Sequence, residues 1–172
     1  SSDAAARLAG NPAVTEPSII DVANQLNRMD DVRALFRAYA EEIGIDLGFQ
    51  VFEDELADLP GRYSAPRGCI LLAELDSEPV ACIALRPLEG DIGEIKRMYV
   101  RPSARGQGLA GRLARECIER ASECGYRRLR LDTLKSMTPA RKLYEALGFK
   151  ETEPYYHNPL PDVVYYQLSL SA

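Results

Sequence analysis

Three β-rich runs follow one another between residues 69 and 100, and they constrain the fold more than any other feature of the sequence. The runs cover residues 69–75, 80–85 and 94–100. Only short turn-forming segments, 76–79 and 89–91, separate them. Consecutive strands with such short links pair antiparallel. We therefore predict a three-stranded meander.

The hydrophobic period changes after residue 100. Apolar residues recur at helical spacing from Leu109 to Ala121, and Gly125 marks the end of this helix. A β-rich run over residues 128–133 follows. A strand, a helix and a second strand in this order predict a right-handed parallel crossover.

The rest of the chain supplies outer elements. We predict an edge strand at 18–22, helices at 30–43, 52–59 and 140–147, and final strands at 149–155 and 163–170. Thr138 is the expected N-cap of the last helix, and Gly148 follows its end. Residues 1–17 are small, polar and interrupted by prolines, so we expect an N-terminal tail before one domain at 18–172. The expected fold class is α/β (α+β), with six to seven mostly antiparallel strands and about four helices.

Composition excludes several functions. The chain is 46% apolar and 27% charged, with a net charge of −5, which argues against a nucleic-acid partner. No apolar run approaches the roughly 20 residues that span a bilayer, so we expect no membrane partner. The four cysteines show neither a CxxC pair nor zinc spacing. We expect no metal site and a reducing, cytoplasmic location.

The glycine-rich run from Arg105 to Gly111 carries the densest chemical signal. Glycines at a helix entry leave main-chain N–H groups uncovered, and the helix N-terminus adds partial positive charge. This combination predicts an anion-binding turn. The alternative is a plain helix entry with glycines for tight packing.

A dinucleotide-binding Rossmann unit is a rival interpretation. Gly106, Gly108 and Gly111 spell GxGxxG, and Asp132 lies at the end of the next strand. Five residues separate Val100 from Gly106, however, whereas a Rossmann glycine ends its strand directly. The meander before the motif also differs from repeated βαβ units. No Gly-Lys-Ser/Thr follows the turn, which excludes a Walker A loop.

Two segments together resemble a known family. The run Arg105-Gly-Gln-Gly-Leu-Ala110 resembles the R/Q-x-x-G-x-G/A pyrophosphate motif of the GNAT superfamily of acyl-CoA-dependent acetyltransferases. The run from Ala140 to Phe149 is similar to the A-x-x-L-Y-x-x-x-G-F segment of that family. The resemblance implies a sheet with splayed central strands and an N-acetyltransferase that uses acetyl-CoA and no metal.

The resemblance also assigns cofactor-binding residues. Main-chain groups of Met98, Tyr99 and Val100 are expected to bind the acetyl-pantetheine arm like an added strand. The pyrophosphate is expected at the amides of the turn, with the Arg105 side chain assisting: Arg105, Gly106, Gln107, Gly108, Leu109 and Ala110. Ala140 opens the second motif, and Met137 stands where many members carry a pantetheine-binding Asn.

Two catalytic residues are implied in the same way. Tyr144 occupies the position of the tyrosine that protonates the departing thiolate, although a core-packing role is the alternative. Glu94 lies where one branch of the family carries its general base, and otherwise it is solvated or paired with Lys96 or Arg97. Regular strand alternation predicts that Glu94, Lys96, Met98 and Val100 share one face, and that Arg97 and Tyr99 share the other.

The acceptor site is the least defined part. Candidates come from the first helices and from the loop before the last strand: Phe49, Tyr63, Arg86, Tyr155, Tyr156 and Asn158. The lone histidine, His157, is more typical of an exposed residue, and Arg62 of a surface arginine. The acceptor is expected to be a small-molecule or peptide amine, with amino acids, polyamines, aminoglycosides and peptides all open.

Three functions therefore remain at this stage. The leading one is acetyl transfer from acetyl-CoA to a primary amine. The second is a non-catalytic acyl-CoA-binding domain, which Met137 favours and Tyr144 and Glu94 disfavour. The third is an NAD(P)-binding Rossmann protein. Homodimers are common in the family that this chain resembles, so a homodimer is possible, but no sequence feature here requires one.

Overall fold

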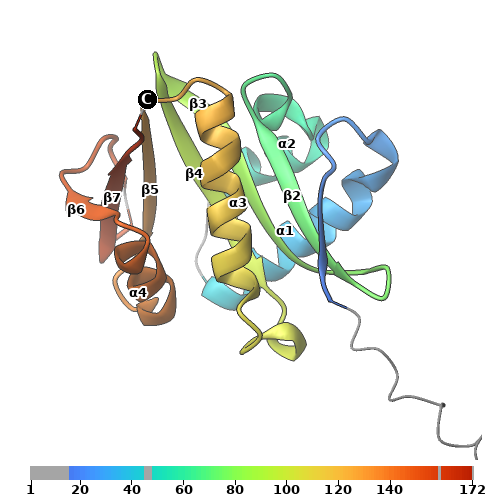
Figure 1. Ribbon diagram of the computed structural model, residues 1–172. Helices are drawn as coiled ribbons and strands as arrows, with labels where there is room; N and C mark the ends of the chain where they lie inside the picture. The colour runs from blue at the N-terminus through green and yellow to red at the C-terminus, as the bar shows by residue number, and fades with distance from the viewer. Residues whose placement is uncertain (1–15, 45–47, 159, 172) are drawn as a thin grey trace, which may run out of the picture.

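The computed structural model describes residues 16–44, 48–158 and 160–171, and these form one seven-stranded sheet with helices on both faces (Figure 1). The strands are β1 (Ser18–Asp21), β2 (Cys69–Leu75), β3 (Glu78–Glu89), β4 (Ile92–Val100), β5 (Arg128–Leu134), β6 (Lys150–Thr152) and β7 (Val163–Ser169). The helices are α1 (Met29–Ile43), α2 (Phe49–Asp58), α3 (Leu109–Glu123) and α4 (Thr138–Ala146), with 3-10 turns η1 (Leu26–Arg28), η2 (Gly61–Tyr63) and η3 (Pro102–Ala104).

The sheet order is β1-β2-β3-β4-β5-β7-β6. Strands β2, β3 and β4 pair antiparallel in succession, which confirms the meander. Strand β5 pairs parallel with β4 after α3, which confirms the parallel crossover. The other described pairings are antiparallel, so the sheet lacks the repeated βαβ units that the Rossmann alternative needs.

Each face of the sheet has its own core. Helix α3 buries one apolar face, including Leu113 and Cys117, against the sheet, and Tyr144 of α4 joins the same cluster. On the opposite face, Leu35 and Phe36 of α1 pack beside residues of α2 and η2. Full burial of such a side chain contributes roughly 1.5–3 kcal/mol, so these faces hold the helices in place.

Several element bounds differ from the sequence-based predictions. Helix α2 begins at Phe49 rather than at residue 52, directly after Gly48 at φ 78°. Strand β3 continues past residue 85 to Glu89, because it pairs with β4 as far as Ile92. Strand β6 has three residues rather than seven, and Pro154 lacks the N–H that a longer ladder requires. Met137 rather than Thr138 is the N-cap of α4.

The tail predicted at residues 1–17 lies outside the described residues, apart from Glu16 and Pro17. The remaining elements agree with their predicted type and order. Helix α1 ends at Gly44, which has φ 62°, and Gly148 follows α4 at φ 98°. Both glycines adopt the left-handed conformation that commonly ends a helix.

Strands β4 and β5 separate along their length. Their parallel pairing covers Ile92↔Arg128, Gly93↔Leu129 and Glu94↔Arg130 and goes no further, although both strands continue. Figure 1 shows them diverging toward α4. This arrangement confirms the predicted splay. Among the described residues, the β5-side edge of β4 has no strand partner beyond Glu94.

A β-bulge interrupts β4 within the diverging part. Ala84 pairs with Lys96 and Cys82 with Tyr99, so Arg97 and Met98 together oppose one residue of β3. Arg97 has φ 60°, which is uncommon for a residue other than glycine. Burial raises the pKa of the Cys82 thiol to about 12, and its Sγ donates a hydrogen bond to the Arg97 carbonyl at 3.2 Å.

The bulge makes the predicted face assignment of β4 wrong for Glu94, although Arg97 and Tyr99 share one face and Met98 and Val100 the other, as predicted. Met98 and Val100 pack against the α3 side of the sheet, as Ile95 does. Arg97 contacts Glu55 of α2, and Tyr99 lies in the core that α1 and α2 cover. One extra residue shifts the strand alternation by one position. Glu94 therefore faces the α2 side with Arg97, opposite to Met98.

Candidate functional site

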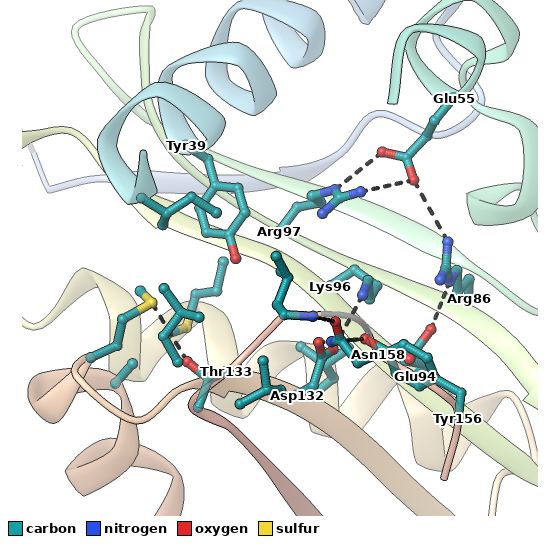
Figure 2. Close-up of a pocket in the computed structure, with 18 of the residues that line it drawn as sticks. Tyr39, Glu55, Arg86, Glu94, Lys96, Arg97, Asp132, Thr133, Tyr156 and Asn158 are labelled. Atoms are coloured by element: carbon teal, nitrogen blue, oxygen red, sulfur yellow. Dashed lines mark hydrogen bonds and ion pairs between the residues drawn. The ribbon is translucent and has the colours of Figure 1, made fainter. Parts of the chain in front are cut away.

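A cavity of about 500 Å³ opens where β4 and β5 separate (Figure 2). Its walls come from α1, α2, β3, both diverging strands, α4 and the segment leading into β7. The residues of one end are mainly apolar, and we call this the apolar end: Met98, Leu134, Met137, Ala140 and Tyr144. The residues of the other end are ionisable, and we call this the charged end: Glu55, Arg86, Glu94, Lys96, Arg97 and Asp132.

Tyr144 is the only ionisable side chain that we include in the apolar end. Its ring packs edge-on against Phe149 with centroids 5.5 Å apart, and the residue is 5% exposed. Its hydroxyl lies 3.6 Å from Met98 Sδ, which is a weak acceptor. Burial raises the pKa of Tyr144 well above its ordinary value. Tyr144 thus fills the core and also presents a protonated hydroxyl to the cavity.

Glu55 of α2 organises one part of the charged end. Arg97 donates to both of its oxygens, Nε to Oε2 at 3.1 Å and Nη2 to Oε1 at 3.3 Å. Arg86 Nη1 lies 3.6 Å from Glu55 Oε1, and the Tyr63 hydroxyl donates to the same oxygen at 2.9 Å. Two guanidinium groups therefore share one carboxylate, as Figure 2 shows.

Glu94 is the most deeply buried charged group of the site, at 1% exposure. Arg86 Nε donates to its Oε1 at 2.8 Å, and the Tyr155 hydroxyl donates to its Oε2 at 2.6 Å. Burial and the neighbouring Glu94 charge raise the pKa of Tyr155. The predicted alternatives for Glu94, solvation or pairing with Lys96 or Arg97, are wrong, because Arg86 is its ionic partner.

Asp132 of β5 holds the other part of the charged end. Lys96 Nζ lies 3.2 Å from its Oδ1, and the Tyr156 hydroxyl donates to its Oδ2 at 2.7 Å. Asn158 in turn donates to the Tyr156 hydroxyl at 2.9 Å. Burial on its own favours a higher Asp132 pKa, but the Lys96 charge and the Tyr156 hydrogen bond outweigh burial and lower the pKa.

The structure brings together some of the predicted acceptor residues. Arg86, Tyr156 and Asn158 line the cavity. Tyr63 and Tyr155 lie behind this lining and hold Glu55 and Glu94 by hydrogen bonds. The lining does not include Phe49, which is 72% exposed on α2, and His157 and Arg62 are exposed outside it as well.

The predicted cofactor residues fall in two places. Met98, Met137 and Ala140 line the cavity at its apolar end, next to the open edge of β4. That edge continues through Tyr99 and Val100, whose partners on the other side are residues of β3. The glycine turn lies beyond the end of β4 and leads into α3.

The glycine turn has the backbone geometry of an anion site. Gly106 has φ 80° and Gly108 has φ 75°. Residues with a side chain rarely adopt this left-handed conformation, whereas glycine does so readily. Gly108 is the N-cap of α3 and provides no side-chain cap. The first amides of a helix lack intrahelical partners, so those of α3 are oriented toward an external acceptor. Arg105 Nη2 pairs with Glu42 of α1 at 2.6 Å.

Several residues that line the cavity were not named as site residues from the sequence. Glu55, Tyr39, Lys96 and Arg97 line the cavity, but none was a candidate. Asp132 was considered only as a ribose-binding residue of the Rossmann alternative. The adjacent basic residues Lys96 and Arg97 inside a buried strand were the signal available in the sequence. A regular strand would bury one of the two on each face of the sheet, which is unfavourable without partners.

Two kinds of site are not found in the part of the chain that the structure describes. Within residues 16–44, 48–158 and 160–171, no helix has the length and apolarity needed to cross a membrane. Over the same residues, no group of three or more His, Cys, Asp and Glu side chains is arranged to hold a metal ion.

Known proteins resemble this chain in sequence and in fold. The model of the acetyltransferase (GNAT) family matches residues 29–149. An uncharacterized N-acetyltransferase of Schizosaccharomyces pombe is 43% identical over 145 residues, which cover 83% of this chain and 89% of that protein. The N-acetylaspartate synthetase of Homo sapiens is 34% identical over 131 residues, covering 75% of this chain and 41% of that protein.

Solved structures support the fold. A crystal structure of a GNAT-family acetyltransferase from Staphylococcus aureus matches with a TM-score of 0.77. The match covers 91% of this chain and all of that chain, at 19% identity. At this level of identity, the likeness bears on the arrangement of the strands and helices.

Proposed function

Because this chain belongs to the acetyltransferase (GNAT) family and is an acyltransferase, we propose that it transfers an acetyl group from acetyl-CoA to a primary amine. One observation carries the proposal. Strands β4 and β5 part after Glu94, and the Tyr144 hydroxyl faces the resulting cavity beside Met98. An open strand edge next to a protonated donor is suited to holding and cleaving a thioester.

The residues present fit acetyl-CoA. The edge of β4 from Met98 to Val100 offers main-chain groups that extend the sheet, as a pantetheine arm requires. The amides from Gly106 to Ala110 would receive the pyrophosphate at the start of α3, where the helix dipole also favours negative charge, whereas the Arg105 amide already donates to the Pro102 carbonyl. Arg105 then exchanges Glu42 for a phosphate oxygen.

The proposed reaction needs two proton transfers. The neutral amine attacks the thioester carbonyl, so that a C–N bond forms and the C–S bond breaks. The departing sulfur takes the proton of Tyr144, which burial keeps protonated. The amine nitrogen loses one proton, and we assign its uptake to Glu94. Because Arg86 and Tyr155 hold both Glu94 oxygens and Tyr155 lies behind the cavity lining, that proton passes to Glu94 through water.

The relatives support nitrogen as the acceptor atom. Their names describe N-acetyltransferases and, for the human protein, a synthetase of N-acetylaspartate, which is an amino acid acetylated on nitrogen. The present chain spans less than half of the human protein, so we take from it only the class of acceptor atom.

A binding test and an activity test examine the proposal together. We expect CoA and acetyl-CoA to raise the melting temperature, because a ligand that binds the folded state stabilises it, and NAD and NADP to leave it unchanged. We also expect free thiol to appear from acetyl-CoA only when an amine is present. Binding of acetyl-CoA without amine-dependent thiol release would contradict transfer and favour the acyl-CoA-binding alternative. Stabilisation by NAD alone would contradict the cofactor assignment.

A further inference from the structure

The Arg97 backbone is strained in a way that serves its side chain. Arg97 is the extra residue of the β4 bulge, and its φ is 60°. Such a conformation costs of order 1–3 kcal/mol in a residue other than glycine and persists only where its surroundings require it. Here this conformation directs the Arg97 side chain into the cavity, where the neighbouring Lys96 already lies. Its guanidinium stands over the Phe52 ring at 5.3 Å, which fixes its orientation.

The charges of the cavity balance. Its lining contains three cations, Arg86, Lys96 and Arg97, and three carboxylates, Glu55, Glu94 and Asp132. Their side chains are between 2% and 19% exposed, so water screens them only in part. A polyamine requires an excess of carboxylates, which this lining lacks. A molecule that carries one charge of each sign matches it.

The two arginines have donors to spare. A guanidinium has five N–H donors, and the bonds of Arg97 to Glu55 use two of them. Arg86 donates one hydrogen bond to Glu94 from Nε, while its Nη1 stays 3.6 Å from Glu55. Two guanidinium groups that share one carboxylate present a ready site for a second carboxylate.

We propose that Arg97 and Arg86 bind the carboxylate of a small amino acid, and that the amino group of this amino acid is the acetyl acceptor. The proposal rests on the proposed acetyl transfer and adds the substrate class to it. The carboxylate takes the remaining donors of the two arginines. The amino group then points from the charged end toward the apolar end, where Tyr144 lies. A polyamine has no carboxylate, so the two arginines cannot orient it in this way.

The test compares free amino acids with their carboxamides, which have the same size and lack the negative charge. Loss of a charge-assisted hydrogen bond predicts a kcat/KM at least about tenfold higher for the acid than for the amide. The amide has the less basic amine, so near neutral pH a larger share of it is in the neutral, attacking form, and a preference for the acid does not come from a larger supply of nucleophile. Spermidine serves as the polycationic acceptor, and we expect it to be the poorest.

The Arg97→Gln variant tests the assignment to this residue. We expect KM for the best amino acid to rise at least about tenfold with little change in kcat, and the rate with its amide to stay unchanged. The matched control is Arg37→Gln, which removes an ion pair between α1 and Glu53 of α2 outside the cavity and leaves both substrates unaffected. Arg97→Lys keeps the charge without the planar fork and should lie between wild type and Arg97→Gln.

The thermal shift caused by CoA reports in each variant that the fold and the cofactor site are intact. Equal rates with acid and amide, a preference for spermidine, or equal loss of both substrates in a folded Arg97→Gln variant would overturn the amino acid assignment and leave amine acetylation standing. Absence of acetylation with every amine would instead refute the proposed function, and this inference with it.

Discussion

The apolar end and the charged end of the cavity are held by different forces. The apolar end consists of side chains packed on α4 and of a strand edge that offers main-chain groups. The charged end consists of side chains from α2, β3, β4 and β5 that fix one another through ion pairs. Main-chain recognition changes little when side chains change, whereas an ion-pair cluster depends on each member. The apolar end is therefore suited to a constant donor, and the charged end to a particular acceptor.

The largest expected effect comes from Tyr144→Phe at the apolar end. Loss of a positioned proton donor lowers kcat by about 100-fold, while the affinity for CoA stays unchanged because the ring still packs on Phe149. Steady-state rates and the CoA-dependent thermal shift measure the two quantities. The control Tyr126→Phe removes another buried hydroxyl, which donates to the Arg67 carbonyl away from the cavity, and should leave kcat unchanged.

The pH dependence follows from the same residue. A raised Tyr144 pKa means that the hydroxyl keeps its proton as the pH rises, so donation is not lost at alkaline pH. The acceptor amine becomes neutral over this range, so the rate rises and then levels off at about pH 10. A decline of kcat toward pH 10 without loss of fold would argue against Tyr144 as the donor.

Glu94→Gln is expected to have an intermediate effect, and it tests whether the charged end contributes to the chemistry as well as to binding. Removal of the proposed proton acceptor lowers kcat by roughly 10-fold or more and alters the dependence of rate on pH. Tyr155 and Arg86 remain in place to hold the amide. An unaltered pH profile would show that water or another group takes the proton. Glu89→Gln, at an exposed carboxylate near the end of β3, is the control.

The smallest effect is expected at the glycine turn. Arg105 is 46% exposed, so Arg105→Gln should weaken CoA binding by only about fivefold and leave the KM of the acceptor unchanged. Glu42→Gln should strengthen CoA binding slightly, because Arg105 loses a competing partner. Calorimetric titration of CoA measures both changes, with Arg112→Gln on the exposed side of α3 as the control. A rise in the KM of the acceptor in Arg105→Gln would contradict the assignment of cofactor and acceptor to separate parts of the site.

Four of the five residues of the apolar end, all except Leu134, were named from the sequence, because the relevant signals are local. The glycine turn, the helix of Tyr144 and the strand edge each lie within a short run, and their periods predict the meander and the crossover. The fold class and the splayed strands followed from these signals and from the family resemblance. The role assigned to Tyr144 stays a prediction, although the structure places its hydroxyl in the cavity.

Arg86 and Glu94 of the charged end were named from the sequence, but Glu55, Lys96 and Arg97 were missed, for two physical reasons. Glu55 and Arg97 are 42 positions apart, and only the packing of α2 on the sheet brings them together. The bulge at Arg97 inserts one residue into β4, and this shift places Glu94 and Met98 on opposite faces, where a regular alternation predicts a shared face. From sequence alone, a glutamate on an amphipathic helix is expected to face solvent, and only the structure of the strand beneath it shows otherwise.

The contact between Arg105 and Glu42 connects two parts of the molecule that a ligand approaches separately. Glu42 lies in the last turn of α1, and this helix also contributes Tyr39 and Ile43 to the cavity wall. A phosphate that takes Arg105 from Glu42 removes one of the anchors of that turn. Thermodynamic linkage is reciprocal, so an acceptor that favours one position of α1 changes the affinity for CoA by the same factor that CoA changes its own. We therefore expect this surface ion pair to couple the occupancy of one substrate site to that of the other.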